Sequence, residues 1–298
     1  MTKRRKKSYS TFIIICILAV IAFAEPYFNK GEESVTVSVN EPLLKVHFID
    51  VKQGDSTLFE FPDGKVMLVD AGENEMGDTV VNYLLENDID KIDYLVGTHP
   101  HSDHIGGLDD VIRNFEVGTL YMPDKVHDSK TFTEVIEIAN EKGINAQIAK
   151  RGVVVTDEEN LKIKFLSPVS ENYESLNNYS SVVSVKYCNA SFLVMGDAEY
   201  VVEKEILNDL EDCDVLRVGH HGSNSSSTAN FLKKVMPEYA VISVGCGNAY
   251  GHPHKEVLNR LKRFDAEIYR TDSDGHIVAT SDGFNISFET ERNNENYN

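Results

Sequence analysis

The sequence has 298 residues, of which 41% are hydrophobic and 26% charged, as is typical of a folded protein of one large or two small domains. Asp and Glu number 48 against 29 Lys and Arg, so the formal net charge is −19. A surface this acidic repels nucleic acid and anionic lipid at long range, which argues against a dedicated DNA-binding protein. A polyanionic substrate stays open, because bound metal ions and local basic loops can reverse the local field.

The N-terminus has the pattern of an export signal or a membrane anchor. A basic cluster at residues 3–7 precedes an almost purely apolar run from Thr11 to Ala24, which is shorter than the roughly 20 residues of a membrane span. Ala22-Phe23-Ala24 offers a cleavage site, and the basic end is expected to stay in the cytoplasm while the rest crosses. The expected organisation is a signal peptide or membrane anchor at 1–24, a polar stalk at 25–41 and an extracytoplasmic folded domain, membrane-anchored or secreted, at 42–298.

The expected elements begin with strands and continue with strands and helices in alternation. Alternating apolar residues predict strands at 43–50, 56–61 and 66–70, with Pro62-Asp63-Gly64 as a hairpin turn. The later expected strands are 92–98, 145–148, 161–166, 182–187, 192–195, 215–218, 239–244 and two or three in the tail, and the expected helices are 78–87, 108–114, 132–142, 201–210, 231–236 and 256–264. This order predicts an α+β protein in which helices cover two packed sheets.

Seven of the ten histidines fall in three short clusters, and each cluster closely follows a predicted strand. Functional side chains at strand ends are typical of layered folds, so the clusters indicate a site rather than scattered surface histidines. The three clusters are His99, His101 and His104; His220 and His221; and His252 and His254.

The first cluster has the residue types and spacing of a metal site. His99 and His101 lie two residues apart in a loop, so both imidazoles can reach one cation. Asp103 and His104 are adjacent and point in different directions, which suits a second cation nearby. Nitrogen and oxygen ligands of this kind suit Zn²⁺ and also Mn²⁺ or Fe. Gly106-Gly107 then allows a tight turn into the next helix.

This His-x-His-x-Asp-His pattern after a strand resembles the signature of the metallo-β-lactamase superfamily. Asp70, at the end of a predicted strand, is similar to a family residue that orients the ligands. Met195-Gly196-Asp197 resembles the motif whose carboxylate bridges two metal ions, and Gly219-His220-His221-Gly222 resembles the final ligand motif. The resemblance implies a four-layer αββα fold, preceded by the N-terminal hydrophobic segment.

Within this superfamily the sequence is most similar to the ComEC-type branch of competence proteins. Residues 50–55, Asp-Val-Lys-Gln-Gly-Asp, resemble the Asp-Val-Gly-Gln-Gly-Asp opening of that branch, with Lys52 in place of the usual glycine. The resemblance covers about residues 43–282 and lacks the membrane-channel portion, so it implies a stand-alone hydrolase. Further motifs of the branch are resembled by Asn177-Asn178-Tyr179-Ser180, Tyr250-Gly251-His252-Pro253-His254 and Thr271-Asp272-Ser273-Asp274-Gly275.

The resemblance implies two divalent metal ions, Zn²⁺ or Mn²⁺. The implied ligands are His99, His101 and Asp197 for one ion, and Asp103, His104, Asp197 and one of His220 and His221 for the other. Many superfamily members carry a third histidine for the first ion. Here residues 105–196 contain only His127, for which we expect a surface role, and Asn177 or Asn178 occupies the corresponding region. The first ion is therefore expected to be weakly held, or completed by water or substrate.

The candidate catalytic residues are Asp103, His221 and His252. One of His220 and His221 is expected to bind metal and the other to contact a substrate oxygen. His252 is expected to donate to the leaving group or to stabilise a phosphoryl oxygen. For Asp55, a tight-turn role and a role in the site both stay open.

The implied mechanism is hydrolysis by a water that two metal ions activate. The ComEC-type resemblance implies a phosphodiester substrate, either nucleic acid or a cell-wall component. Two alternatives stay open: a hydrolase of a cyclic amide or ester such as a β-lactam or lactone, and a metal-binding surface protein without turnover. The membrane is an expected partner through residues 1–24 if they are uncleaved, and no protein partner is indicated.

Overall fold

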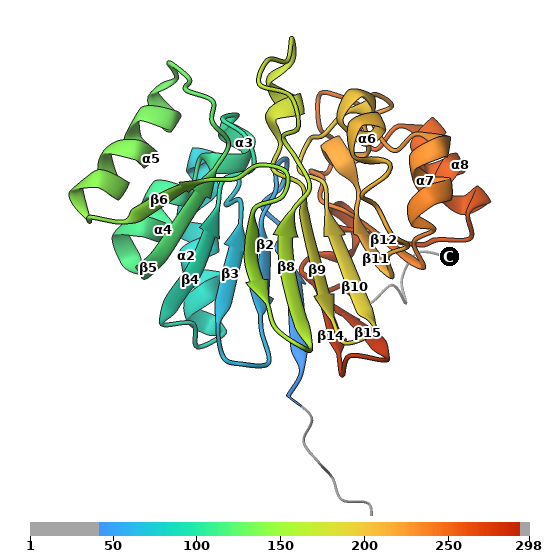
Figure 1. The fold of residues 1–298 in the computed structure, drawn as a ribbon, viewed down its shortest axis with the longest axis horizontal. Helices are drawn as coiled ribbons and strands as arrows, with labels where there is room; N and C mark the ends of the chain where they lie inside the picture. Colours follow the sequence, from blue (N-terminus) through green and yellow to red (C-terminus); the bar gives the residue numbers. More distant parts are fainter. Residues whose placement is uncertain (1–41, 293–298) are drawn as a thin grey trace, which may run out of the picture. The chain divides into compact units, whose positions relative to one another are not determined.

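The computed structural model describes residues 42–292, which form two β-sheets with helices on the outer face of each (Figure 1). The predicted signal peptide or anchor and the predicted stalk lie outside the described residues. Between residues 42 and 292, no helix has the length and hydropathy needed to cross a membrane.

The first sheet has eight strands in the order β15-β14-β1-β2-β3-β4-β5-β6. Its strands are β1 (Leu44–Phe48), β2 (Thr57–Glu60), β3 (Val66–Val69), β4 (Lys91–Val96), β5 (Glu116–Met122), β6 (Asn145–Ile148), β14 (Ile277–Ser281) and β15 (Ile286–Thr290). Neighbours from β3 to β6 are parallel, whereas the pairs from β15 to β3 are antiparallel.

The second sheet has seven strands in the order β13-β12-β11-β10-β9-β8-β7. Its strands are β7 (Val154–Asp157), β8 (Leu161–Phe165), β9 (Val183–Tyr187), β10 (Ala190–Val194), β11 (Val215–Arg217), β12 (Tyr239–Ile242) and β13 (Glu267–Arg270). Strands β10 to β13 are parallel to one another. Each sheet therefore has a parallel half, and parallel strands end at a common edge.

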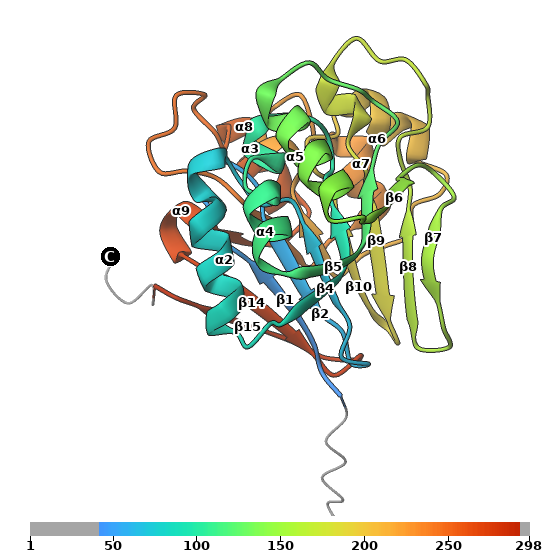
Figure 2. The ribbon, with the colours of Figure 1, turned by 90° about the vertical axis from the view of Figure 1, so that its left-hand side faces the viewer.

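Three helices of seven residues or more cover each sheet on its outer face (Figure 1). Over the first sheet lie α2 (Gly77–Glu86), α4 (Leu108–Asn114) and α5 (Lys130–Glu141), and over the second lie α6 (Tyr200–Ile206), α7 (Ala229–Val235) and α8 (Lys255–Arg263). The single-turn elements are η1 (Asn74–Met76), α3 (Ser102–Ile105), η2 (Leu176–Tyr179), η3 (Gly219–Gly222) and α9 (Thr271–Asp274). Figure 2 shows the first set of helices from their own side.

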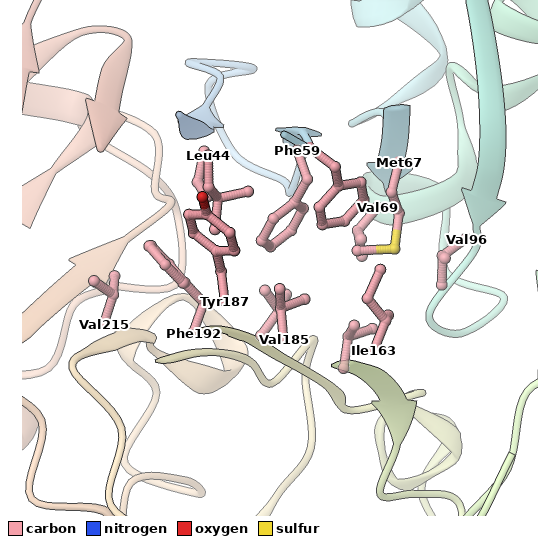
Figure 3. Packing of buried hydrophobic residues seen from close by; sticks show 14 of the residues in the cluster. Leu44, Phe59, Met67, Val69, Val96, Ile163, Val185, Tyr187, Phe192 and Val215 are labelled. Carbon is pink, nitrogen blue, oxygen red and sulfur yellow. The ribbon is translucent and has the colours of Figure 1, made fainter. Parts of the chain in front are cut away.

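Alternation along the strands divides the apolar residues between three core layers. In β3, Met67 and Val69 face the second sheet, whereas Leu68 faces the helices, as the two-residue period of a strand requires. The central layer lies between the two sheets and is shown in Figure 3, where side chains from one sheet meet those of the other. Members of this layer labelled there are Leu44, Phe59, Met67 and Val69 from the first sheet and Ile163, Val185, Tyr187, Phe192 and Val215 from the second.

The predicted four-layer αββα architecture is confirmed, and most predicted elements are present within a few residues of their expected ends. Strand β5 was not predicted from the sequence, although it lies inside the first sheet. Gly118 interrupts its apolar pattern, and a Cβ there would lie 2.6 Å from Asp93 O. A glycine inside a strand marks such a close backbone approach, and it also weakens the sequence signal for the strand.

Candidate metal centre

The first histidine cluster lies where β4 ends and the chain enters α3. His99 Nε2 lies 3.0 Å from His101 Nδ1. Two imidazole nitrogens bound to one tetrahedral cation would be about 3.3 Å apart, given metal–nitrogen bonds of roughly 2.0–2.1 Å. Thr98 Oγ1 donates its hydrogen to Asp70 and so accepts from His99 Nδ1 at 3.1 Å. This leaves the Nε2 lone pair of His99 available on the side that faces His101.

Two glycines allow α3 to sit against the loop that follows β3. A Cβ on Gly107 would lie 2.5 Å from Ala71 O and 2.8 Å from Gly77 Cα, and a Cβ on Gly106 would overlap Asn74 N. From the sequence, Gly106 and Gly107 were expected to allow a tight turn into the next helix. Neither residue is among the glycines with positive φ, so the requirement is for close packing instead.

A four-residue cluster of potential metal ligands consists of Asp103, His104, Asp197 and His221. One ligand atom from each residue lies within 4.8 Å of all the others. His104 Nε2 is 3.2 Å from Asp197 Oδ1, and His221 Nε2 is 3.2 Å from Asp103 Oδ2. His104 Nε2 and Asp197 Oδ1 are buried, and within residues 42–292 they make ion-pair contacts but no hydrogen bond. Buried polar atoms are rarely left unpaired, so this donor set fits a divalent cation.

Hydrogen bonds on the far side of each ring aim His104 and His221 at this cluster. His104 Nδ1 donates to Asp70 Oδ2 at 2.7 Å, and Asp70 also accepts from Thr98 N at 2.8 Å. His221 Nδ1 donates to Ser243 O at 3.0 Å. A proton held at Nδ1 leaves the Nε2 lone pair for a metal ion, which is the usual arrangement around histidine ligands.

The backbone separates the two adjacent histidines of the second motif. His220 and His221 both have left-handed conformations, with φ of 52° and 51°, which is unfavourable for residues other than glycine. Their rings are 69° apart in plane. His221 is thereby directed into the cluster. His220 lies beside it, with Nδ1 hydrogen-bonded to Ser225 Oγ at 2.9 Å and Nε2 3.6 Å from Asp197 Oδ2.

Burial and the surrounding charges decide the protonation of the cluster. Burial favours neutral groups, but His221 and His104 outweigh it and hold the pKa of Asp197 well below its usual range. The pKa of Asp103 also lies below its usual value, because His104 and His221 outweigh the effect of burial there too. Burial alone would lower the pKa of His104, and the carboxylates of Asp197, Asp70 and Asp103 reverse this and raise it well above its usual value. A cation entering the cluster would therefore displace protons.

A buried ion pair behind the cluster was missed by the sequence analysis. Arg217 is fully buried, pairs with Asp55 and donates to Gly196 O at 2.6 Å. Asp55 Oδ2 also lies 3.6 Å from His104 Nδ1. This places Asp55 next to the site rather than only in a turn. The available signal was a single arginine at the end of an apolar strand directly before a histidine motif.

Asn177 and Asn178 lie where many superfamily members are expected to carry a third histidine ligand, and both contact Glu199. Glu199 was not identified from the sequence as part of the site. Asn178 Nδ2 donates to Glu199 Oε2 at 3.0 Å, and Asn178 Oδ1 accepts from Glu199 N at 3.1 Å. Asn177 Nδ2 lies 3.3 Å from Glu199 Oε1 and 3.4 Å from either ring nitrogen of His220. Asn177 Oδ1 is buried and has no partner in the described part of the chain.

The remaining histidines lie at different distances from the cluster. The ring centroid of His252 is 5.5 Å from that of His220, and burial together with the neighbouring histidines lowers its pKa to about 4, so His252 is neutral at pH 7. His254 Nδ1 accepts from Asn224 N at 3.0 Å, which indicates a structural role. His127 belongs to no group of potential metal ligands found within residues 42–292.

Comparison with known proteins gives the family. The model described as the metallo-beta-lactamase superfamily matches residues 49–245. ComE operon protein 3 of Bacillus subtilis is 32% identical over 89% of this chain and 35% of that protein. Recombination protein 2 of Haemophilus influenzae is 29% identical over 80% of this chain and 29% of that protein. Competence protein ComA of Neisseria gonorrhoeae is 30% identical over 76% of this chain and 30% of that protein.

The chain spans about a third of the length of these curated relatives. Among solved structures, CmlA, a diiron beta-hydroxylase from Streptomyces venezuelae, matches with a TM-score of 0.52 and 12% identity over 76% of this chain and 52% of that one. This likeness shows the fold alone. By its family match and its relatives, the chain belongs to the metallo-β-lactamase superfamily, in the ComEC-type branch.

Proposed function

We propose that this chain is an exported phosphodiesterase that uses two divalent metal ions, Zn²⁺ or Mn²⁺. The observation that carries the proposal is the four-residue cluster, in which His104 Nε2 and Asp197 Oδ1 are buried and make no hydrogen bond within residues 42–292. The pair His99 and His101 lies beside it, with two imidazole nitrogens 3.0 Å apart. These two groups would provide ligands for two ions at one edge of the sheets.

The positions of the donor atoms support the following proposed ligand assignment. His99, His101 and Asp197 would hold the first ion, and Asp103, His104, Asp197 and His221 the second. When bound, two divalent cations supply a nucleophilic water at neutral pH and stabilise the negative charge that develops on the substrate. Between the two adjacent histidines, His221 is the proposed ligand because only its Nε2 lies in the cluster.

The remaining polar groups are proposed to act on substrate oxygens. Asp103, whose pKa lies below its usual value, is ionised and can accept a hydrogen bond from the attacking water. His220 is held by Ser225 beside the cluster, where it can donate to a phosphoryl oxygen. His252 is neutral at pH 7 and can donate a hydrogen bond to the leaving-group oxygen.

Two observations favour a phosphodiester over a cyclic amide or ester. Two of the relatives are named a recombination protein and a competence protein, which supports a nucleic-acid substrate. In addition, His220 and His252 lie beside the cluster as potential hydrogen-bond donors, and a phosphodiester presents two non-bridging oxygens that share one negative charge. Cell-wall phosphodiesters share this chemistry and are the second substrate class that we propose.

The proposed location is outside the cytoplasm, either membrane-anchored or secreted. Its support is the basic cluster at 3–7, the apolar run that follows and the small residues around Ala24. Fractionation of cells that produce the tagged full-length chain, with mass analysis of its N-terminus, tests this part. A tag recovered in the cytoplasm would contradict it.

The activity is tested with bis(p-nitrophenyl) phosphate and the full-length chain loaded with Zn²⁺ or Mn²⁺. His101→Ala removes a proposed ligand. His276→Gln is a matched histidine variant outside the four-residue cluster and the pair of His99 and His101. Metal-dependent turnover that His101→Ala abolishes and His276→Gln retains would support the proposal. Bound metal without turnover would contradict it and favour an amide or ester substrate, or a binding role without turnover.

A further inference from the structure

An exposed aromatic side chain lies at the edge of the metal centre, on the loop between β12 and α8. Tyr250 is 67% exposed. The loop projects from the body of the molecule beside α8, in orange (Figure 2). It leads from the end of β12 to His252, whose ring lies next to those of His220 and His221. Neither the ligand clusters nor the proposed mechanism uses Tyr250.

The Tyr250 ring continues a series of nearly parallel rings that leads out of the metal centre. The ring centroids of Tyr250 and His252 are 5.6 Å apart with an angle of 21° between planes. The ring of His252 is 6.3 Å from that of His221 at 28°. Tyr250 therefore presents a flat surface to solvent, two ring contacts from a proposed metal ligand. A planar group stacked there would leave an attached phosphodiester close to the centre.

The side chain of Asn248 holds this loop in a defined conformation. Asn248 Nδ2 donates to Gly245 O at 2.9 Å and to His252 O at 2.6 Å. Asn248 Oδ1 accepts from Tyr250 N at 3.1 Å and from His252 N at 3.0 Å. One half-buried amide thus bonds both ends of the loop, so Tyr250 is exposed but not loosely placed. A preorganised ring loses little conformational entropy when a ligand stacks on it.

A lysine lies beside the start of the same loop. Gly245 N donates to Gln53 Oε1 at 3.2 Å, and a Cβ on Gly245 would lie 3.1 Å from Lys52 C. Lys52 has φ of 60°, a conformation that favours glycine, and its side chain is exposed. Lys52 takes part in none of the ion pairs found within residues 42–292. Its ammonium group is available to an anion from outside.

We infer that Tyr250 and Lys52 bind a single strand of nucleic acid at the metal centre, with a base stacked on Tyr250 and a backbone phosphate near Lys52. This inference rests on the proposed phosphodiesterase function and narrows its substrate class. Stacking on one aromatic side chain and a cation for the phosphate are the usual elements of single-strand binding. A base inside a duplex is stacked on both faces and has none to offer, so we expect this surface to bind single strands in preference to duplex DNA.

A choline-bearing wall polymer would also meet an aromatic ring, but it fits the surface less well. Quaternary ammonium groups are bound by cages of several aromatic rings. The ring contacts of Tyr250 within residues 42–292 are with His252 only. A cationic choline would furthermore be repelled by Lys52, which a phosphate attracts.

The test measures binding of a fluorescent oligothymidylate to the metal-loaded full-length chain by anisotropy, with phosphorothioate linkages that resist cleavage. Tyr250→Ala is expected to weaken binding roughly 5- to 150-fold, the range for loss of one base–aromatic contact. Tyr250→Phe keeps the ring and is expected to bind like the original chain. Phe284→Ala, which removes another exposed aromatic side chain from the β14–β15 turn, is the matched control and is expected to have no effect.

Lys52→Gly suits the local backbone and isolates the phosphate contact. It is expected to reduce the slope of log K against log salt concentration by about 0.7, the value for one phosphate contact on a single strand. An unchanged affinity for Tyr250→Ala, equal binding of duplex and single strand, or competition by a phosphocholine polymer would each overturn the inference.

The outcomes separate this inference from the proposed function. Binding that depends on Tyr250, in a chain that cleaves no phosphodiester, would keep the inference and contradict the activity. Cleavage of bis(p-nitrophenyl) phosphate together with oligothymidylate binding that is indifferent to Tyr250 would do the reverse.

Discussion

The hydrogen bond between Asp70 and His104 offers a direct test of how the proposed metal ligands are oriented. Asp70 Oδ2 accepts from His104 Nδ1 at 2.7 Å, and Asp70 Oδ1 accepts from Thr98 N at 2.8 Å. In Asp70→Asn the amide oxygen can keep the bond to Thr98. The amide NH₂ then faces His104 Nδ1, which favours the tautomer with its proton on Nε2. That proton would occupy the lone pair on which the second ion depends.

The expected loss is 10- to 100-fold in affinity for the second metal ion, or about 1.4 to 2.8 kcal/mol, as is usual when a partner of a histidine ligand is changed. The stability of the metal-free chain should change much less, because burial disfavours the ionised form of Asp70 and raises its pKa. Asp109→Asn is the control, since Asp109 pairs with Arg113 on a helix surface.

Competition with a chromophoric chelator measures the affinity, and a urea titration of the metal-free chain measures the stability. An unchanged metal affinity for Asp70→Asn would refute the orienting role of Asp70. Equal losses in metal affinity and in the stability of the metal-free chain would assign to Asp70 a role in folding instead.

The remaining predictions concern the metal, the adjacent histidines and the packing of α3. Chelation should lower the melting temperature, because a metal ion at a free concentration of a hundred times its dissociation constant stabilises the folded state by about 2.7 kcal/mol. A melting curve unaffected by chelator would contradict a metal centre in this cluster. His221→Ala should reduce the bound metal by elemental analysis, whereas His220→Ala should keep the metal and lower kcat; the opposite pattern would exchange their roles. Gly107→Ala should destabilise the fold by about 1–3 kcal/mol in urea, because its Cβ would lie 2.5 Å from Ala71 O, and a stable variant would show that α3 can move away.

Much of this protein could be predicted from local sequence patterns. The strand and helix periods, and the position of histidine clusters directly after strands, predicted two sheets covered by helices and a site at the strand ends. The motif from His99 to His104 spans six residues, so its geometry depends on little beyond its own backbone. Patterns of this kind are readable because the responsible contacts are close in the chain.

Contacts between distant parts of the chain were decided by the tertiary structure. Arg217 pairs with Asp55 only because the two sheets bring the ends of two separate motifs together. The left-handed backbone at two consecutive residues determined that His221, and not His220, enters the cluster. The proposed role of Tyr250 depends on the stacking of its ring on His252, which the tertiary structure decides. Spacing along the chain encodes the period of a strand or helix, but the direction of a side chain at a loop depends on which distant segment packs against it.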